Sequence, residues 1–222
     1  MEATSEISGG SLRKLYGGTL RFVKQIDMNT LESIPQTVLE RPKRADARRN
    51  YDKLLAAARE AFAQGGEATA LEEIARRAGV GIGTLYRHFP NRQALLEAVY
   101  LDEVEGVCRT AAEADGEPWE ALNDWLERFI AYLATKRALA GELVNYLGAD
   151  APLFKTCRTT LFAAGEPLLT RAQEAGVVRL DVDIADVMQL VMGISKIPAT
   201  DPTQTEHILR IALDGLRRVP GS

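Results

Sequence analysis

Glycine and proline fix where helices can end along this chain, and after Asp46 they recur at intervals that suit a helical protein. The breaks fall at Gly65-Gly66, Gly79, Pro90, Gly116 to Pro118, Gly148 to Pro152, Gly176 and Pro198 to Pro202. Between them Ala, Leu, Glu and Arg dominate, and no sustained alternation of apolar and polar residues indicates a strand. The sequence therefore predicts an all-α protein of about nine helices, because each break is a helix stop or a turn signal.

The first forty residues do not follow this pattern. Ser8 to Ser11 and Gly17-Gly18 interrupt a stretch of weak periodicity, so residues 1–40 are expected to form a flexible N-terminal extension. Met28 lies inside it, which leaves open whether residues 1–27 belong to the native protein.

Charge is distributed unevenly along a chain whose formal net charge is −4. Residues 41–100 hold eleven Lys and Arg against seven Asp and Glu, whereas residues 101–222 hold twelve against nineteen. A basic segment on an acidic body is expected when one end meets a polyanion such as nucleic acid. The alternative is an uneven but merely solvated surface.

The basic segment contains two short helical stretches joined by a glycine. An amphipathic helix over residues 51–62 comes first, and Thr69 with Glu72 fits a capping box for a second helix over residues 71–78. Gly79 ends that helix, and residues 82–89 allow barely two more turns before Pro90. This is a helix-turn-helix, whose second helix fits the major groove of B-DNA.

The spacing of the second short helix also predicts its two faces. Leu85 and Phe89, four residues apart, are expected to face Ile74 and the first helix. That arrangement leaves Thr84, Arg87 and His88 pointing outward, with Tyr86 at the edge.

The segment from Leu71 to Leu96, LEEIARRAGVGIGTLYRHFPNRQALL, resembles the DNA-binding signature of the TetR family of transcriptional regulators. The resemblance covers residues 48–100. It implies contacts to phosphates or bases from Thr84, Tyr86 and His88, base-reading positions at Ile82 and Gly83, and a contact to the DNA backbone from Arg92. Direct readout would fall to Thr84, Arg87 and an apolar contact of Ile82 with a thymine methyl group.

Two positions depart from the family pattern, because Ala70 and Gly81 stand where hydroxyl residues are frequent. Capping of the second helix, and a phosphate contact there, would then fall to Thr69. Ahead of the first helix, Lys43, Arg44, Arg48 and Arg49 are expected to follow the phosphates, as a basic arm does in related proteins. The alternative for these four is a solvated, basic helix start.

The resemblance divides the chain into the extension over 1–40, a helix-turn-helix domain over 41–92 and a helical ligand-binding and dimerisation domain over 93–222. A long helix starting at Asn91 would link the last two. Aromatic side chains can wall a ligand cavity, and the candidates are Trp125, Phe129 and Phe162, with ordinary core as the alternative.

Apolar stripes near the C-terminus suggest how two copies would associate. Residues 184–192 and 208–216 each carry a stripe at helical spacing, and small residues in the second allow close approach of helices. The expected homodimer contacts are Val187, Val191, Ile208, Ala212 and Gly215, and the alternative is burial within one subunit.

Little in the sequence supports an enzyme. The histidines, His88 and His207, form no group with metal-ligand spacing, and no cofactor or metal is expected. The two cysteines suit apolar packing in a reducing cytoplasm, and charges interrupt the apolar stretches before a membrane-spanning length.

We expect a cytoplasmic repressor that binds a palindromic operator in double-stranded DNA and is released by a small molecule. The alternative is a helical adaptor that binds protein partners without DNA.

Overall fold

The structure, a computed structural model, describes residues 41–65, 68–197 and 202–218. Within these ranges it is helical and contains no strand, the only β-type pairing being an isolated bridge between Val178 and Arg217. The all-α prediction is therefore confirmed. The predicted extension over residues 1–40 lies outside the described residues, as does Met28 within it.

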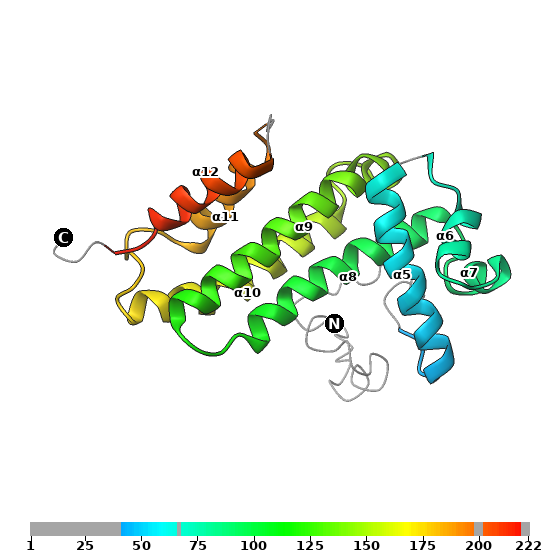
Figure 1. The fold of residues 1–222 in the computed structure, drawn as a ribbon, viewed down its shortest axis with the longest axis horizontal. Coiled ribbons are helices and arrows are strands. Elements are labelled where there is room, and N and C mark those ends of the chain that lie inside the picture. The colour runs from blue at the N-terminus through cyan, green and yellow to red at the C-terminus, as the bar shows by residue number, and fades with distance from the viewer. Residues whose placement is uncertain (1–40, 66–67, 198–201, 219–222) are drawn as a thin grey trace, which may run out of the picture.

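Eight α-helices lie in the described ranges and are labelled in Figure 1. They are α5 (Ala45–Gly65), α6 (Leu71–Arg77), α7 (Ile82–His88), α8 (Arg92–Glu113), α9 (Pro118–Leu147), α10 (Pro152–Glu174), α11 (Ile184–Ser195) and α12 (Pro202–Asp214). Their ends follow the glycine and proline breaks. Pro118 and Pro152 open α9 and α10, where the missing N–H costs no helical hydrogen bond.

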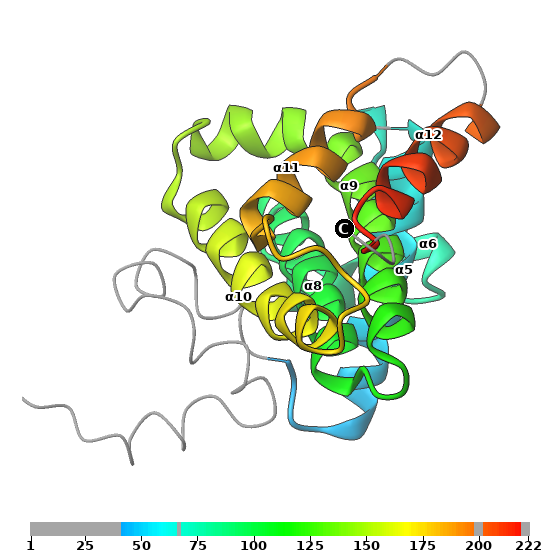
Figure 2. The same ribbon diagram turned by 90° about the vertical axis from the view of Figure 1, so that its left-hand side faces the viewer.

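Three long helices, α8, α9 and α10, pack side by side and form the body (Figure 1). The short helices α6 and α7 lie beside α5 at one end, and α5 also packs against α8 and α9. At the other end α11 contacts α9 and α10, and α12 packs on α11. In the end-on view of Figure 2, α8 is seen between α9 and α10.

The central helix α8 runs through the body and also packs against α5. It is buried on every face from Ala94 to Leu101, including Glu97, whose carboxylate accepts a hydrogen bond from Gln93 Nε2 at 2.7 Å. A helix enclosed in this way moves only together with its neighbours. Its first turn is capped by Asn91, whose Oδ1 accepts from the backbone N–H of Ala94 at 2.8 Å.

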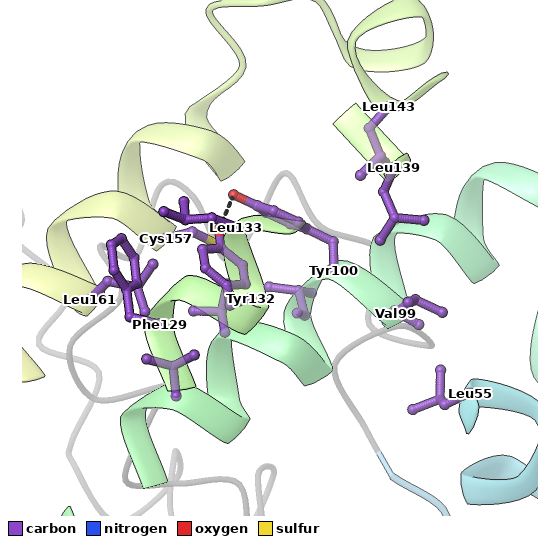
Figure 3. Packing of buried hydrophobic residues seen from close by; sticks show 14 of the residues in the cluster. Leu55, Val99, Tyr100, Phe129, Tyr132, Leu133, Leu139, Leu143, Cys157 and Leu161 are labelled. Atoms are coloured by element: carbon purple, nitrogen blue, oxygen red, sulfur yellow. Dashed lines mark hydrogen bonds between the residues drawn. The ribbon is translucent and has the colours of Figure 1, made fainter. Parts of the chain in front are cut away.

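Side chains from three helices meet in the core of the body (Figure 3). Tyr132 of α9 donates its hydroxyl hydrogen bond to the Tyr100 hydroxyl of α8 at 3.2 Å, and Cys157 of α10 lies beside them. Burial raises the pKa of the Cys157 thiol to about 12. The thiol therefore stays protonated near neutral pH and packs as a small apolar side chain.

Candidate nucleic-acid interface

The turn between α6 and α7 depends on a left-handed backbone at one residue. Gly79 has φ +67°, and beyond it the backbone N–H of Val80 bonds to the carbonyl of Ala75 at 3.0 Å. A residue with a Cβ is strained there by about 1 kcal/mol or more, which is why glycine holds the position. The helix-turn-helix predicted from the sequence is present in the structure.

The recognition-helix candidate α7 is anchored by two buried side chains. Leu85 and Phe89 are fully buried and so is Ile74 of α6, as the four-residue spacing predicted. The ring of Tyr51, from α5, packs against Phe89 with 5.0 Å between centroids. This packing sets the orientation of α7 on the surface of the head, the unit formed by α5, α6 and α7.

The other face of α7 is exposed and carries most of the predicted contacts. Tyr86 is 45% exposed and Ile82 37%, with Gly83 and Arg87 exposed beside them. Thr84 and His88 are half-buried. Tyr86 thus projects further than its expected edge position, because the inward side of this two-turn helix is filled by Leu85.

His88 lies partly behind this surface. Its ring meets the Tyr51 ring edge-on at 5.9 Å between centroids. Burial, and to a smaller degree the neighbouring Arg87, lower the pKa of His88 below its ordinary value. The imidazole is therefore neutral near pH 7, when it can hydrogen-bond as a donor or an acceptor but adds no positive charge.

The predicted basic arm is on the surface at the start of α5. Lys43, Arg44, Arg48 and Arg49 are all exposed, and Arg48 Nε donates to the carbonyl of Pro42 at 3.3 Å. Their cationic groups are available to solvent or to phosphates. Arg41 differs, because its guanidinium is held by Asp52 and Asp102.

The predicted capping box at α6 is wrong. The residue preceding the helix is Ala70, and no side chain caps the helix there. The Thr69 hydroxyl instead donates to the carbonyl of Ala61 in α5 at 3.0 Å, so it is engaged by another helix and does not cap α6. A capping box does occur in the body, where Asp183 and Asp186 open α11.

Arg92, expected on the DNA backbone, is engaged inside the protein. Its guanidinium makes two contacts with the Glu142 carboxylate, one of them Nη2–Oε2 at 2.8 Å, and also donates to the carbonyl of Thr69. It lies over the Phe62 ring at 4.9 Å from the centroid, and its side chain is only 18% exposed. Arg92 therefore joins α5 and the loop before α6 to the C-terminal part of α9.

A second group of ion pairs joins the head to the body through α8. Arg59 of α5 donates to Asp102 at 2.6 Å and also pairs with Glu103. Arg128 of α9 reaches the same Glu103 at 3.3 Å. Gly106 makes room for it, since a Cβ at that position would lie 2.8 Å from Arg128 Nη2. Sequence reasoning missed this network because its partners are far apart along the chain.

The predicted ligand residues lie in the packed core of the body. Trp125 and Phe129 are buried and stack at 6.0 Å between centroids, whereas Phe162 is half-buried. Gly165 lets α10 approach this stack, because a Cβ there would lie 2.2 Å from the Trp125 ring. One cavity of about 310 Å³ lies among the charged residues around Asp102, and another of about 490 Å³ lies between α9 and α12. Neither is lined by the three predicted aromatic residues.

The predicted dimer stripe on α11 requires a correction. Val187 and Val191 are fully buried within one subunit, because α11 turns that face toward α9 and α10. On α12, Ile208 and Ala212 are half-buried, and Gly215, which directly follows this helix, is exposed. The apolar side chains that do face outward are Leu190 of α11, at 39% exposure, and Ile211 of α12, at 59%.

The described residues contain neither a group of side chains that could hold a metal ion nor a helix long and apolar enough to cross a membrane.

Comparison with known proteins finds a family match for the N-terminal helices of the described chain and another for its C-terminal helices. Residues 54–99 match the family described as bacterial regulatory proteins, tetR family, and residues 117–218 match the C-terminal domain described as transcriptional regulator SbtR-like. The HTH-type transcriptional regulator UidR of Escherichia coli K12 is 25% identical over 188 residues, which are 79% of this chain and 93% of UidR.

Two solved structures are more similar in sequence. The TetR transcriptional regulator SCO0520 from Streptomyces coelicolor is 38% identical with a TM-score of 0.69, and the alignment covers 76% of this chain and 98% of that one. A TetR transcription regulatory protein from Mycobacterium vanbaalenii is 37% identical with a TM-score of 0.66, over 80% of this chain and all of the other. The chain therefore belongs to the TetR family of transcriptional regulators, which are DNA-binding proteins and not enzymes.

Proposed function

We propose that this regulator is a cytoplasmic homodimer that represses transcription by occupying a palindromic operator and leaves it when a small molecule binds. The observation that carries the proposal is the exposed outer face of α7, which lies on the same head as the exposed basic side chains at the start of α5. A short helix presented in this way suits the major groove, and the flanking cations suit phosphates.

Six residues of α7, four of them exposed and two half-buried, have proposed roles. Arg87 and Thr84 read base edges, and Ile82 contacts a thymine methyl group. Gly83 allows the helix backbone to approach the DNA closely, because an added Cβ there meets no other protein atom. Tyr86 and His88 bond to phosphates, and His88 does so as a neutral imidazole.

The proposed phosphate contacts at the start of α5 are Lys43, Arg44, Arg48 and Arg49. Each such contact steepens the salt dependence of DNA binding by about 0.9 in log–log slope. Thr69 and Arg92 act indirectly in this proposal, because their polar groups are bonded to other parts of the protein. They support the position of the head instead of touching the operator.

Dimerisation is proposed through the outward face of α12 with the adjoining surface of α11. Ile208, Ile211 and Ala212 lie on that face of α12, Gly215 directly follows the helix, and Leu190 of α11 is exposed as well. An isologous contact between two such surfaces would use the same residues of both subunits. Release follows when a ligand changes the spacing of the two recognition helices.

Two sets of ion pairs could transmit a movement of the body to the head. The ion pairs of Asp102 and Glu103 tie α8 to α5, and Arg92 ties the head to α9. In the described conformation Trp125 and Phe129 are enclosed, so a ligand reaches them only if α9 and α10 separate, with Phe162 at the edge of that path.

Selection of bound duplexes from a random pool at near-physiological salt tests the proposal. We expect a two-fold-symmetric motif. Arg87→Ala should lose preference for it while remaining dimeric, and Arg158→Ala, an exposed arginine on α10, should behave as the unmodified chain. Recovery of no motif, or equal selectivity in Arg87→Ala, would refute the role given to α7. A dimer that binds no duplex would favour a helical adaptor.

A further inference from the structure

The cavity between α9 and α12 has the size and chemistry of a small-molecule site. Its volume of about 490 Å³ falls within the range of about 300–1,000 Å³ that is usual for ligand pockets. Trp119, Ile130 and Leu213 supply its apolar lining. Figures 1 and 2 show α12 against α11 on the outside of the body.

Polar groups of the groove come from both walls. Glu127 lies on α9 and Asp214 on α12, and Asn123 Nδ2 donates to Glu127 Oε1 at 3.1 Å. In the described part of the chain, Asp214 has no ion pair, and Arg210 is the sole cationic residue that lines the groove. Two carboxylates on opposite walls and one arginine therefore line the groove, and all three residues are exposed.

The indole of Trp119 gives the groove an aromatic surface. The guanidinium carbon of Arg217 lies 5.0 Å from the Trp119 ring centroid, so one face of the ring is already covered by a cation and a ligand meets the part of the indole that Arg217 leaves uncovered. An aromatic face attracts cations through its quadrupole, and nearby carboxylates strengthen that attraction. A ligand with both an apolar body and a positive charge would match the apolar residues and the carboxylates that line the groove.

The groove and the outward face of α12 lie on opposite sides of that helix. Successive residues of an α-helix are rotated by about 100°, which places Leu213 across the helix from Ile208 and Ile211. The burial agrees, since Ile211 is 59% exposed whereas Leu213, beside the groove, is 5% exposed. A molecule lodged against α9 would thus push on the helix whose other face is exposed.

We propose that the α9–α12 groove is an effector site for an amphipathic cation. The apolar body of the ligand packs on Trp119, Ile130 and Leu213, and its positive charge lies between Glu127 and Asp214. Occupancy shifts α12 relative to α9. The consequence for operator release rests on the function proposed above, but binding at the groove does not.

Tetraphenylphosphonium and tetraphenylborate test the charge preference, because they share a shape and differ in sign. Calorimetric titration of the full-length protein should show binding of the phosphonium and at least about tenfold weaker binding of the borate. Glu127→Gln and Asp214→Asn should each weaken phosphonium binding by about tenfold. Asp124→Asn, which alters an exposed carboxylate of α9 outside the groove, should leave it within about twofold.

A second variant blocks the site without changing charge. Ala131 lines the groove and is exposed, so Ala131→Phe should abolish phosphonium binding in a folded protein. The ligand should also change the fluorescence of Trp119, and Trp119→Phe, which retains the buried Trp125, should lose that change.

These experiments distinguish a failure of the proposed effector site from a failure of the proposed function. Equal affinity for the two ions, or unchanged affinity in both carboxylate variants, would overturn the effector site. If the unliganded chain selects no duplex, the proposed function fails while the titration still decides the site. Where an operator is found, saturating phosphonium should weaken its binding in the unmodified chain and not in Ala131→Phe, and an equal effect in both would overturn the proposed regulation.

Discussion

The contact between Arg92 and Glu142 allows the structure to be tested against the DNA-contact role that the family resemblance implies for Arg92. Glu142→Gln preserves the size of the side chain but removes the charge that holds the guanidinium at 2.8 Å. Breaking a fully buried ion pair costs about 3–5 kcal/mol. Because Arg92 and Glu142 keep 18% and 11% exposure, we expect a smaller loss of about 1–2 kcal/mol in the free energy of unfolding.

Arg92→Met should cost more, because it also removes the bond to the carbonyl of Thr69 and the contact with the Phe62 ring. We expect a loss of about 2–3 kcal/mol in the free energy of unfolding. The double variant should be more stable than the sum of the single losses predicts, by about 1 kcal/mol, because the second substitution no longer breaks the shared pair.

The assay is urea unfolding of all four proteins at one protein concentration, since an oligomer's stability depends on concentration. DNA affinity measured against salt gives an independent readout. A lost phosphate contact would lower the log–log slope by about 0.9 in Arg92→Met and leave Glu142→Gln unchanged. Additive stability losses together with that change in slope would refute the internal role and restore the DNA contact.

Three further predictions concern single positions. Gly165→Ala should destabilise the body by about 1–3 kcal/mol and alter Trp125 fluorescence, because the new Cβ would lie 2.2 Å from that ring, and an unchanged unfolding midpoint would contradict the packing. Gly79→Ala should lower the free energy of unfolding by about 1 kcal/mol, owing to its positive φ, and weaken operator binding, whereas wild-type stability would show that the turn adapts. His88 has a folded pKa below its ordinary value of 6.5, so the unfolded chain binds the proton first and stability falls as the pH drops below about 6.5. Thermal unfolding at pH 7.5 and 5.5 should show a smaller difference in His88→Gln, and an equal difference in both proteins would exclude this contribution.

The sequence alone was sufficient for the fold class and for the helix-turn-helix. Gly79 and Pro90 leave room for only a short helix between them, and the four-residue spacing of Leu85 and Phe89 defines its buried side. These features depend on the backbone preferences of single residues and on neighbours one turn away. Such information is present in the order of the residues.

Tertiary structure decided which partner each polar or apolar face meets. Thr69 had the spacing of a capping box, yet its hydroxyl bonds to Ala61 of another helix. The stripe containing Val187 predicted an apolar contact correctly, but whether a second copy or the same subunit covers it depends on how α11 lies on the body. Arg92 and Glu142 are fifty residues apart, and no local pattern marks them as a pair. The periodicity of one helix specifies that a face is buried, whereas the identity of its partner follows only when all the helices pack at once.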